Sequence, residues 1–223
     1  MSRTVVCVML AENRVAICEY GRRMAADGLV VGTSGNISVR SGELVAVTPT
    51  GVGYSGMRPQ DVTVVALDGS IVDGRLRPTS ELPMHLAVYG KATDPDGEPV
   101  TAVVHTHSAH ATAVSTLVEE VPPVHYLLAS IGPSARVAPY ATYGTTELAD
   151  TMLAALTGRR GCLLANHGTI TYGDGLEAAY QRARLLEWVC QVWLLARSAG
   201  TPSLLPAEEI SRVVERLRGY GQR

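Results

Sequence analysis

Short apolar runs separated by glycine-containing turns fill the first third of the chain. Apolar and polar residues alternate on both sides of Ser41-Gly42, and again on both sides of Asp68-Gly69. Alternation around a tight turn predicts a β-hairpin, whose two strands are antiparallel. The expected strands are one that ends at Arg40 and those over residues 43–48, 62–67 and 70–72.

Other segments repeat their apolar residues at the period of a helix. Ile17, Cys18 and Met24 follow this spacing in a segment that Gly28 ends. A later segment places Leu186 and Val189 on one face of a long helix. Helices are expected over residues 13–27, 78–89, 109–117, 145–156, 176–199 and 206–218.

The second half of the chain alternates these helices with further apolar runs. Strands are expected over residues 101–107, 162–166 and 169–172, and residues 137–140 fit either a strand or an extended loop. The sequence contains no internal repeat, linker or low-complexity stretch. We therefore expect one α/β domain that takes in residues 1–223.

Composition narrows the class of protein. The 223 residues are 46% hydrophobic and 18% charged, as in a globular chain with an ample core. A net charge of −2 offers no basic excess to neutralise phosphates, which argues against nucleic acid as a partner. No apolar run approaches the roughly 20 residues of a membrane span, and no signal peptide is recognisable.

The cysteines indicate the cellular compartment. They are scattered singly in apolar surroundings, which favours buried free thiols over disulfides. We expect a cytoplasmic protein on this basis. The four are Cys7, Cys18, Cys162 and Cys190.

Three histidines are candidate metal ligands. His105 and His107 are two apart in a β-branched run, and side chains two apart in a strand point to the same face. His167 follows a second apolar run and precedes a glycine. Three imidazoles leave a position on the metal open for substrate, as catalytic sites do. A surface strand or a hydrogen-bonded pair in the core remains the alternative for the His-x-His pair.

The single lysine bears on how a carbonyl substrate would be activated. Lys91 lies in a polar segment rich in glycine, aspartate and proline, where we expect it to be solvated. A Schiff-base enzyme needs a buried lysine with a lowered pKa. An enzyme with this sequence that activates a carbonyl would therefore use a metal.

Three small polar loops are candidate anion sites. Gly35-Asn36, Thr50-Gly51 and Thr79-Ser80 each offer free backbone N–H groups, and the last lies at an expected helix N-terminus. Each also fits an ordinary turn or cap. Glu81 is expected in the first turn of that helix, either as a capping residue or as a carboxylate near the metal.

Five segments occur together in an order and spacing that resemble the class II aldolase/adducin family. The resemblance covers nearly the whole chain. It implies a three-layer fold in which helices flank a central, mainly antiparallel sheet. The segments are Thr33-Ser34-Gly35-Asn36-Ile37-Ser38, Thr48-Pro49-Thr50-Gly51, Pro78-Thr79-Ser80-Glu81, His105-Thr106-His107 and Asn166-His167-Gly168.

The resemblance also implies an activity. The expected enzyme is a zinc-dependent aldehyde lyase that reversibly cleaves a ketose 1-phosphate. L-fuculose 1-phosphate would give dihydroxyacetone phosphate and L-lactaldehyde. The family assembles as a cyclic homotetramer with its active sites between subunits, and one Zn²⁺ is expected per subunit.

Residue roles follow from the same resemblance. His105, His107 and His167 would hold the ion, with Glu81 as a fourth ligand that leaves on substrate binding and then moves a proton. Tyr126 would come from a neighbouring subunit and protonate the aldehyde oxygen. Tyr143 and Tyr220 would line the aldehyde end. The phosphate would be held by Gly35, Asn36, Thr50, Gly51, Thr79 and Ser80.

Other functions on the same scaffold remain open at this point. An L-ribulose-5-phosphate 4-epimerase resembles this chain but has an aspartate where Glu81 stands, which favours the aldolase. A methylthioribulose-1-phosphate dehydratase shares the His-Thr-His-Ser string. A metal-free, adducin-like interaction domain would not need the three histidines. His85 and His110 are expected to be structural and not ligands.

Overall fold

The computed structural model describes residues 9–218. Six α-helices lie in this part of the chain, and each matches an expected helix, α5 with both ends as predicted and the others with shifted ends. Two short 3-10 helices, Pro59–Asp61 and Tyr126–Ser130, lie in connecting segments. The α-helices are α1 (Ala11–Ala26), α2 (Leu82–Lys91), α3 (Ala109–Ser115), α4 (Thr146–Leu156), α5 (Leu176–Ala199) and α6 (Ala207–Arg218).

Nine strands of the described residues form one sheet, in the order β4-β3-β2-β1-β5-β9-β8-β7-β6. Every neighbouring pair is antiparallel except β7 and β8. The predicted α/β fold with a mainly antiparallel sheet is therefore confirmed. The strands are β1 (Asn36–Ser41), β2 (Leu44–Val47), β3 (Thr63–Ala66), β4 (Ile71–Asp73), β5 (Ala102–Thr106), β6 (Glu120–Val121), β7 (Ala135–Ala138), β8 (Gly161–Leu164) and β9 (Gly168–Gly173).

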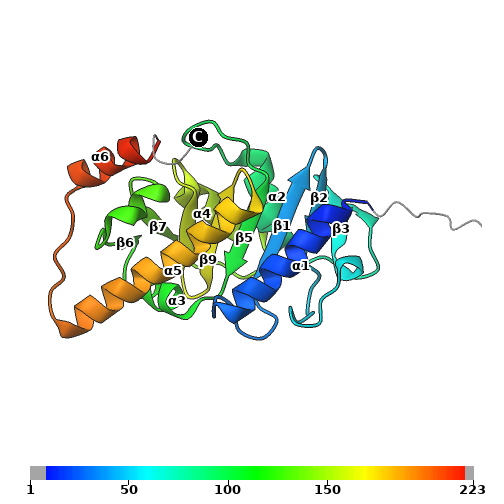
Figure 1. Cartoon of the computed structure of the whole chain (residues 1–223), viewed down its shortest axis with the longest axis horizontal. Coiled ribbons are helices and arrows are strands. Elements are labelled where there is room, and N and C mark those ends of the chain that lie inside the picture. Colours follow the sequence, from blue (N-terminus) through cyan, green and yellow to red (C-terminus); the bar gives the residue numbers. More distant parts are fainter. Residues whose placement is uncertain (1–8, 219–223) are drawn as a thin grey trace, which may run out of the picture.

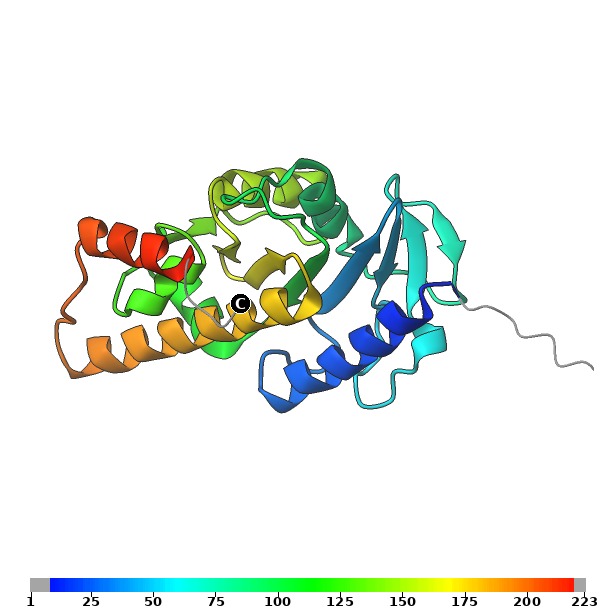
Figure 2. The same cartoon turned by 45° about the horizontal axis from the view of Figure 1, so that its top comes forward.

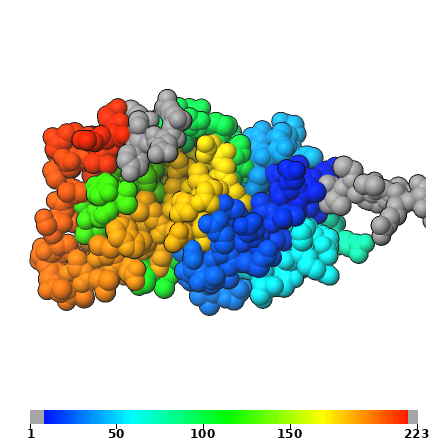
Figure 3. Space-filling model, in the orientation of Figure 1, coloured from blue at the N-terminus to red at the C-terminus, as the bar shows by residue number. Residues whose placement is uncertain are grey.

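Helices cover both faces of the sheet, so the molecule has three layers. α1 and α5 lie on one face, in front of the strands in Figure 1, and their side chains cover that face in Figure 3. α2 and α4 pack on the other face, which Figure 2 shows uppermost. Alternation along β5 serves both layers, because Val103 packs toward α2 and α4 while Val104 packs toward α1 and α5.

Strand β5 lies at the centre of this arrangement and carries the first candidate ligand. All five of its residues are buried, as expected for a strand covered on both faces. β5 pairs with β1 on one side and with β9 on the other. His105 lies opposite Asn36 of β1 and opposite Ile170 of β9. His105 therefore points to the same face as Val103, the face that α2 covers.

The expected helix start at Pro78 is wrong. α2 begins at Leu82, and Glu81 is its N-cap residue, although its carboxylate caps no backbone N–H. Backbone pairing explains the difference, because the Thr79 N–H donates to the Thr48 oxygen at 3.0 Å and the Thr50 N–H donates to the Arg77 oxygen at 3.1 Å. This pairing holds the segment before Glu81 extended and places the two polar loops side by side.

Other departures are small. β6 was not expected, and β7 covers residues 135–138 and not 137–140. Lys91 closes α2 instead of lying in a loop, yet its side chain is 69% exposed, so the expectation of a solvated amine is confirmed. No helix between residues 9 and 218 is both long and apolar enough to cross a membrane.

The turn that follows β8 depends on a glycine. A Cβ built on Gly168 would lie 2.0 Å from the Thr106 oxygen and 3.2 Å from the His107 Cα, because β9 passes directly beside β5 there. Asn166, in the same turn, adopts the left-handed conformation with φ 56°. Only glycine lets β9, which begins directly after His167, approach the strand carrying His105 so closely.

Gly168→Ala is expected to lower the free energy of unfolding by at least about 2 kcal/mol, because backbone atoms must move to admit the methyl group. Urea denaturation followed by circular dichroism measures this. Gly56→Ala is the matched control, since Gly56 is exposed and no neighbouring atom lies within 4 Å of its added Cβ. Equal stability of the two variants would contradict the close approach of β5 and β9.

Candidate metal centre and active site

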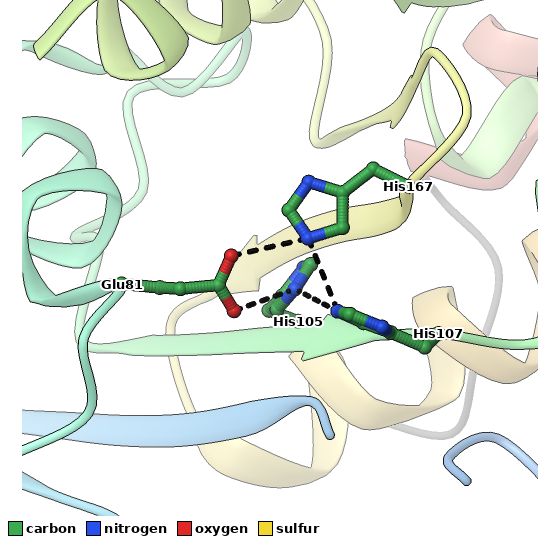
Figure 4. A group of neighbouring side chains, drawn as sticks. All are labelled: Glu81, His105, His107 and His167. Carbon is green, nitrogen blue, oxygen red and sulfur yellow. Dashed lines mark hydrogen bonds and ion pairs between the residues drawn. The ribbon is translucent and has the colours of Figure 1, made fainter. Parts of the chain in front are cut away.

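Four side chains converge at one end of β5. The carboxylate of Glu81 and the Nε2 atoms of His105, His107 and His167 point toward one another, as Figure 4 shows. Each residue offers a ligand atom, and these atoms all lie within 4.8 Å of one another. The expectation that the three histidines come together is confirmed by this geometry, and the alternative of a surface strand is wrong.

Different elements supply these groups. His105 lies on β5 and His107 directly after it, where the His107 backbone N–H donates to the Leu29 oxygen at 3.0 Å. His167 lies in the turn between β8 and β9. Glu81 enters from the N-terminal end of α2, which packs on the same face of the sheet. Residues 60 or more positions apart are thus fixed by strand pairing and helix packing.

Hydrogen bonding determines which nitrogen of His105 is free. Its Nδ1 lies 2.8 Å from the Thr169 backbone oxygen, which can only accept, so Nδ1 carries the proton. In the neutral ring, Nε2 then carries a lone pair and no proton. It faces the His107 Nε2 at 2.9 Å and the Glu81 Oε2 at 3.0 Å. His107 can donate to this nitrogen, but Glu81 can only accept, so the His105 Nε2 and the Glu81 Oε2 repel one another unless a proton or a metal cation lies between them.

The remaining contacts lead to the same requirement. The Nε2 atoms of His107 and His167 are 3.1 Å apart. Glu81 Oε1 is buried and accepts no well-directed hydrogen bond, although His167 Nε2 lies 3.1 Å away. A buried carboxylate oxygen without a donor is costly. A cation held by the four groups would satisfy all of them.

The pKa shifts of Glu81 and His107 favour their metal-binding forms, and that of His105 opposes its metal-binding form. Burial opposes ionisation of Glu81, yet the charges and hydrogen bonds of His105 and His167 hold its pKa far below the usual value. Burial lowers the pKa of His107 to about 3, and the nearby His105 and His167 add to the effect. Burial would also lower the pKa of His105, but the Glu81 carboxylate outweighs it and raises that pKa. An ionised carboxylate and unprotonated imidazole nitrogens are the metal-binding forms.

Zinc fits this donor set in chemistry and in spacing. Imidazole nitrogens and a carboxylate are typical zinc ligands. Ligand atoms 2.0–2.1 Å from a tetrahedral ion would lie about 3.3 Å apart. Four contacts between ligand atoms here are 2.9–3.1 Å, and all the ligand atoms lie within 4.8 Å of one another, so a small rearrangement of the side chains would admit the ion.

A cavity of about 420 Å³ opens beside the four groups. All six residues expected to hold a phosphate line it, so the three polar loops do come together. Gly35 has φ +71°, and a Cβ there would meet the His105 oxygen at 2.8 Å. The full lining is Thr33, Ser34, Gly35, Asn36, Pro49, Thr50, Gly51, Thr79, Ser80, Glu81, His107, Tyr140, Ala141, Tyr143, Asn166 and His167.

The expected tyrosines separate into three cases. Tyr143 lines the cavity and is 66% exposed. Tyr126 does not line it; it is 49% exposed and its ring lies 4.6 Å from that of His125. Tyr220 lies outside the described residues. Of the expected tyrosines that lie within residues 9–218, Tyr143 lines the cavity of its own subunit and Tyr126 does not.

Sequence reasoning missed several lining residues. Tyr140 and Asn166 both face the cavity. His110 is not a ligand, because its ring binds Glu187 at 2.6 Å. His85 is not one either, but it has polar partners close to Glu81.

Comparison with known proteins identifies the family. Residues 15–194 match the model of the class II aldolase and adducin N-terminal domain. The chain belongs to the class II aldolase and adducin family. This match spans the metal centre and the cavity, while the expectation that the domain takes in all of residues 1–223 stays a prediction.

Within the class II aldolase and adducin family, the chain is similar over nearly its full length to named enzymes. It is 41% identical to a 5-deoxy-D-ribulose 1-phosphate aldolase of Bacillus thuringiensis, covering 96% of this chain and all of that one. It is 38% identical to an L-fuculose phosphate aldolase of Escherichia coli, covering 96% and 99%. A solved L-fuculose 1-phosphate aldolase superposes with a TM-score of 0.88 at 35% identity, covering 93% and 97%.

Proposed function

We propose that this protein is a zinc-dependent aldehyde lyase that reversibly cleaves a ketose 1-phosphate into dihydroxyacetone phosphate and an aldehyde. The observation that supports it most is the cluster of three imidazoles and one carboxylate beside a cavity lined by the three small polar loops. Family membership and full-length similarity to aldolases agree with an aldehyde-lyase activity.

His105, His107 and His167 would hold the ion, with Glu81 as the fourth ligand before substrate binds. The bound ion supplies Lewis-acid stabilisation of the negative charge that develops beside the substrate carbonyl. Three nitrogen ligands are enough to keep it, so the carboxylate is free to be displaced. This distribution of roles accounts for why the three histidines surround one side of Glu81.

Glu81 would move the proton in the reaction. Cleavage leaves the three-carbon half as an enediolate, and one of its carbons must gain a proton before dihydroxyacetone phosphate is released. Glu81 is the only carboxylate among the described residues that line the cavity. Once displaced from the ion, its pKa would rise toward a value suited to proton transfer.

The polar loops would hold the phosphate. Thr50 and Gly51 lie next to Thr79 and Ser80 because of the pairing before α2, and both loops line the cavity with Gly35 and Asn36. Hydroxyls and backbone N–H groups that converge in this way suit a phosphate. Binding energy from the phosphate would then place the reacting bond against Glu81.

The identity of the aldehyde half is part of the proposal. L-fuculose 1-phosphate and 5-deoxyribulose 1-phosphate share the half that carries the phosphate and differ at the far end. Tyr143, and the newly found Tyr140, lie at the exposed mouth of the cavity where that end would project. We propose L-fuculose 1-phosphate as a substrate, with the 5-deoxyribulose sugar as the competitor suggested by the Bacillus relative.

Assembly as a cyclic homotetramer is also part of the proposal. Tyr126 lies outside the cavity of its own subunit, and it stays exposed next to His125, which packs edge-on against the Trp188 ring. It would serve as the acid at the aldehyde oxygen only in a neighbouring subunit. A cytoplasmic location fits Cys18, Cys162 and Cys190, which are buried free thiols, while Cys7 lies outside the described residues.

The proposed function is tested by release of dihydroxyacetone phosphate from a panel of sugars. Zinc-loaded protein should release it from L-fuculose 1-phosphate, and removal of the ion by a chelator should abolish release until Zn²⁺ is restored. The same ketose without its phosphate should react at least about 100-fold more slowly in kcat/KM, because it forfeits the remote binding energy.

Other outcomes of this assay distinguish the alternatives. Release that persists after complete chelation would dismiss the metal. No release, together with epimerisation of L-ribulose 5-phosphate at C4, would favour the epimerase. No turnover of any sugar phosphate by zinc-loaded protein would favour an interaction domain.

A further inference from the structure

A line of buried hydrogen bonds runs from Glu81 into the layer between β1 and α2. The Asn36 Nδ2 donates to the Glu81 Oε2 at 2.9 Å, and the Asn36 Oδ1 lies 2.5 Å from the His85 Nε2. The other ring nitrogen, Nδ1, lies 2.7 Å from the Ser38 Oγ, which lies 2.7 Å from the Tyr89 hydroxyl. Five side chains thus form one continuous chain.

Each hydrogen in this chain has a determined position. The Glu81 carboxylate can only accept, so Asn36 must turn its NH₂ group toward it and its oxygen toward His85. His85 must then donate from Nε2, which leaves Nδ1 to accept from the Ser38 hydroxyl. Because Ser38 has only one proton to give, the Tyr89 hydroxyl donates to it. All four hydrogen bonds therefore point toward Glu81.

The surroundings keep the chain in this state. Asn36, Ser38, His85 and Tyr89 are each at most 6% exposed, so water does not compete for them. Burial lowers the pKa of His85 to about 3, with the nearby His105 ring adding to the effect, and the His85 ring is neutral. A neutral ring has one donor and one acceptor, as the chain requires. Hydrogen bonds that point the same way strengthen one another.

Strand and helix geometry explains why these residues meet. Asn36 and Ser38 are two apart on β1 and face α2. His85 and Tyr89 are four apart on α2, on its buried side. Glu81 is four residues before His85 on the same helical face. The polar face of β1 therefore matches a polar stripe on α2 where an apolar contact would be expected.

We propose that His85 is a positioning residue, which fixes the amide orientation of Asn36 and thereby holds the Glu81 carboxylate where it exchanges between the metal and the substrate proton. Without the His85 Nε2–H donor, no hydrogen bond to the Asn36 oxygen holds the amide NH₂ group toward Glu81. Its oxygen would face a carboxylate in the flipped orientation and repel it. This inference rests on the proposed function, because the role of Glu81 in moving a proton is part of that function.

The tautomer of His85 tests the hydrogen-bond chain without an activity assay. Two-dimensional NMR of ¹⁵N-histidine-labelled, zinc-loaded protein distinguishes the two neutral tautomers and the charged ring. His85→Gln assigns the signal by its loss. We expect a neutral ring protonated at Nε2. Protonation at Nδ1, or at both nitrogens, would overturn the proposal whether or not the protein is an aldolase.

A matched pair of variants tests the positioning role. His85→Leu removes the donor, while His85→Gln retains an amide donor at about the place of Nε2. We expect the leucine variant to lose about 10- to 100-fold in kcat, with zinc content unchanged and a smaller change in KM. The glutamine variant should recover most of this loss. A folded, zinc-loaded leucine variant with wild-type kcat would overturn the proposal, and so would a glutamine variant that is no better.

Tyr89→Phe separates positioning from a general loss of packing. It removes a hydrogen bond at the far end of the same buried chain, three links from Glu81. We expect kcat within a few-fold of the wild type, even where the variant unfolds as readily as His85→Leu. A loss of kcat as large as that of His85→Leu would show that the effect is not specific to Asn36 and Glu81, and would contradict the proposal.

Discussion

Glu81→Gln should lower kcat by at least about 1,000-fold while the variant stays folded and keeps its zinc. The substitution preserves the volume of the side chain and an oxygen that accepts from Asn36, so packing at the start of α2 is retained. It removes the only carboxylate among the described residues that line the cavity. Loss of a general base costs about 10²–10⁴-fold, and loss of the displaceable negative ligand adds to this. Steady-state release of dihydroxyacetone phosphate, with metal analysis of the same sample, measures it.

Glu177→Gln is the matched control for this experiment. Glu177 lies on α5, and its side chain is 57% exposed and binds Arg23. Glu177→Gln removes one negative charge, as Glu81→Gln does, but away from the cavity. Its kcat should therefore stay within about two-fold of the wild type. Near-normal turnover by Glu81→Gln would mean that the proton is moved by another group, and the role of Glu81 would be reduced to holding the metal.

The parts of the site that follow local periodicity were predictable. His105 and His107 are two apart in an apolar run, and strand alternation alone places their rings together. The hairpins around Ser41-Gly42 and Asp68-Gly69 form as expected, because turn residues and alternation agree. A histidine before a glycine, at the end of another strand, indicated His167. These signals all lie within a few residues of the groups they predict.

The parts that depend on pairing between distant segments were not predictable from periodicity. Residues 78–81 satisfy the local rules for a helix start, yet backbone bonds to residues 48 and 50 hold residues 77–79 extended, and residues 80–81 form a turn before the helix. From its own segment Glu81 was either a capping residue or a carboxylate near the metal, and only the family resemblance gave it the role of ligand, since nothing in the segment indicates that α2 packs beside His105. His85 was expected to be structural for the same reason, because its partner Asn36 is 49 residues away.

The candidate phosphate site combines features that local sequence predicts with features that depend on long-range packing. Each of its loops was recognised as an anion site or an ordinary turn, and sequence alone left that choice open. In the structure the three loops line one shared cavity, which supports the proposed phosphate site. Tyr140 was overlooked because an exposed aromatic residue in an irregular segment carries no periodic signal. Only the placement of residues 140–143 over the cavity shows that both tyrosines face it.

Removal of one metal ligand should have the other large effect. His107→Ala is expected to lower zinc content well below one ion per subunit and to cut kcat/KM at least about 1,000-fold, because about 4 kcal/mol or more of charge stabilisation is lost. His107 is preferable to His105, whose ring is fully buried and whose removal would leave a void in the core. Metal analysis after dialysis, and kinetics at saturating Zn²⁺, measure the two effects.

The stability of the same variant distinguishes loss of a ligand from damage to the fold. Without metal, His107→Ala should unfold at a temperature no lower than the metal-free wild type, because it relieves the contacts of 2.9 and 3.1 Å between imidazole nitrogens. With Zn²⁺ added, the wild type should be stabilised by binding and the variant much less. His110→Ala, which removes a histidine bound to Glu187 outside the cluster, should keep the full zinc-dependent rise. An equal rise in His107→Ala would mean that the ion is bound elsewhere, and the three-histidine centre would have to be abandoned.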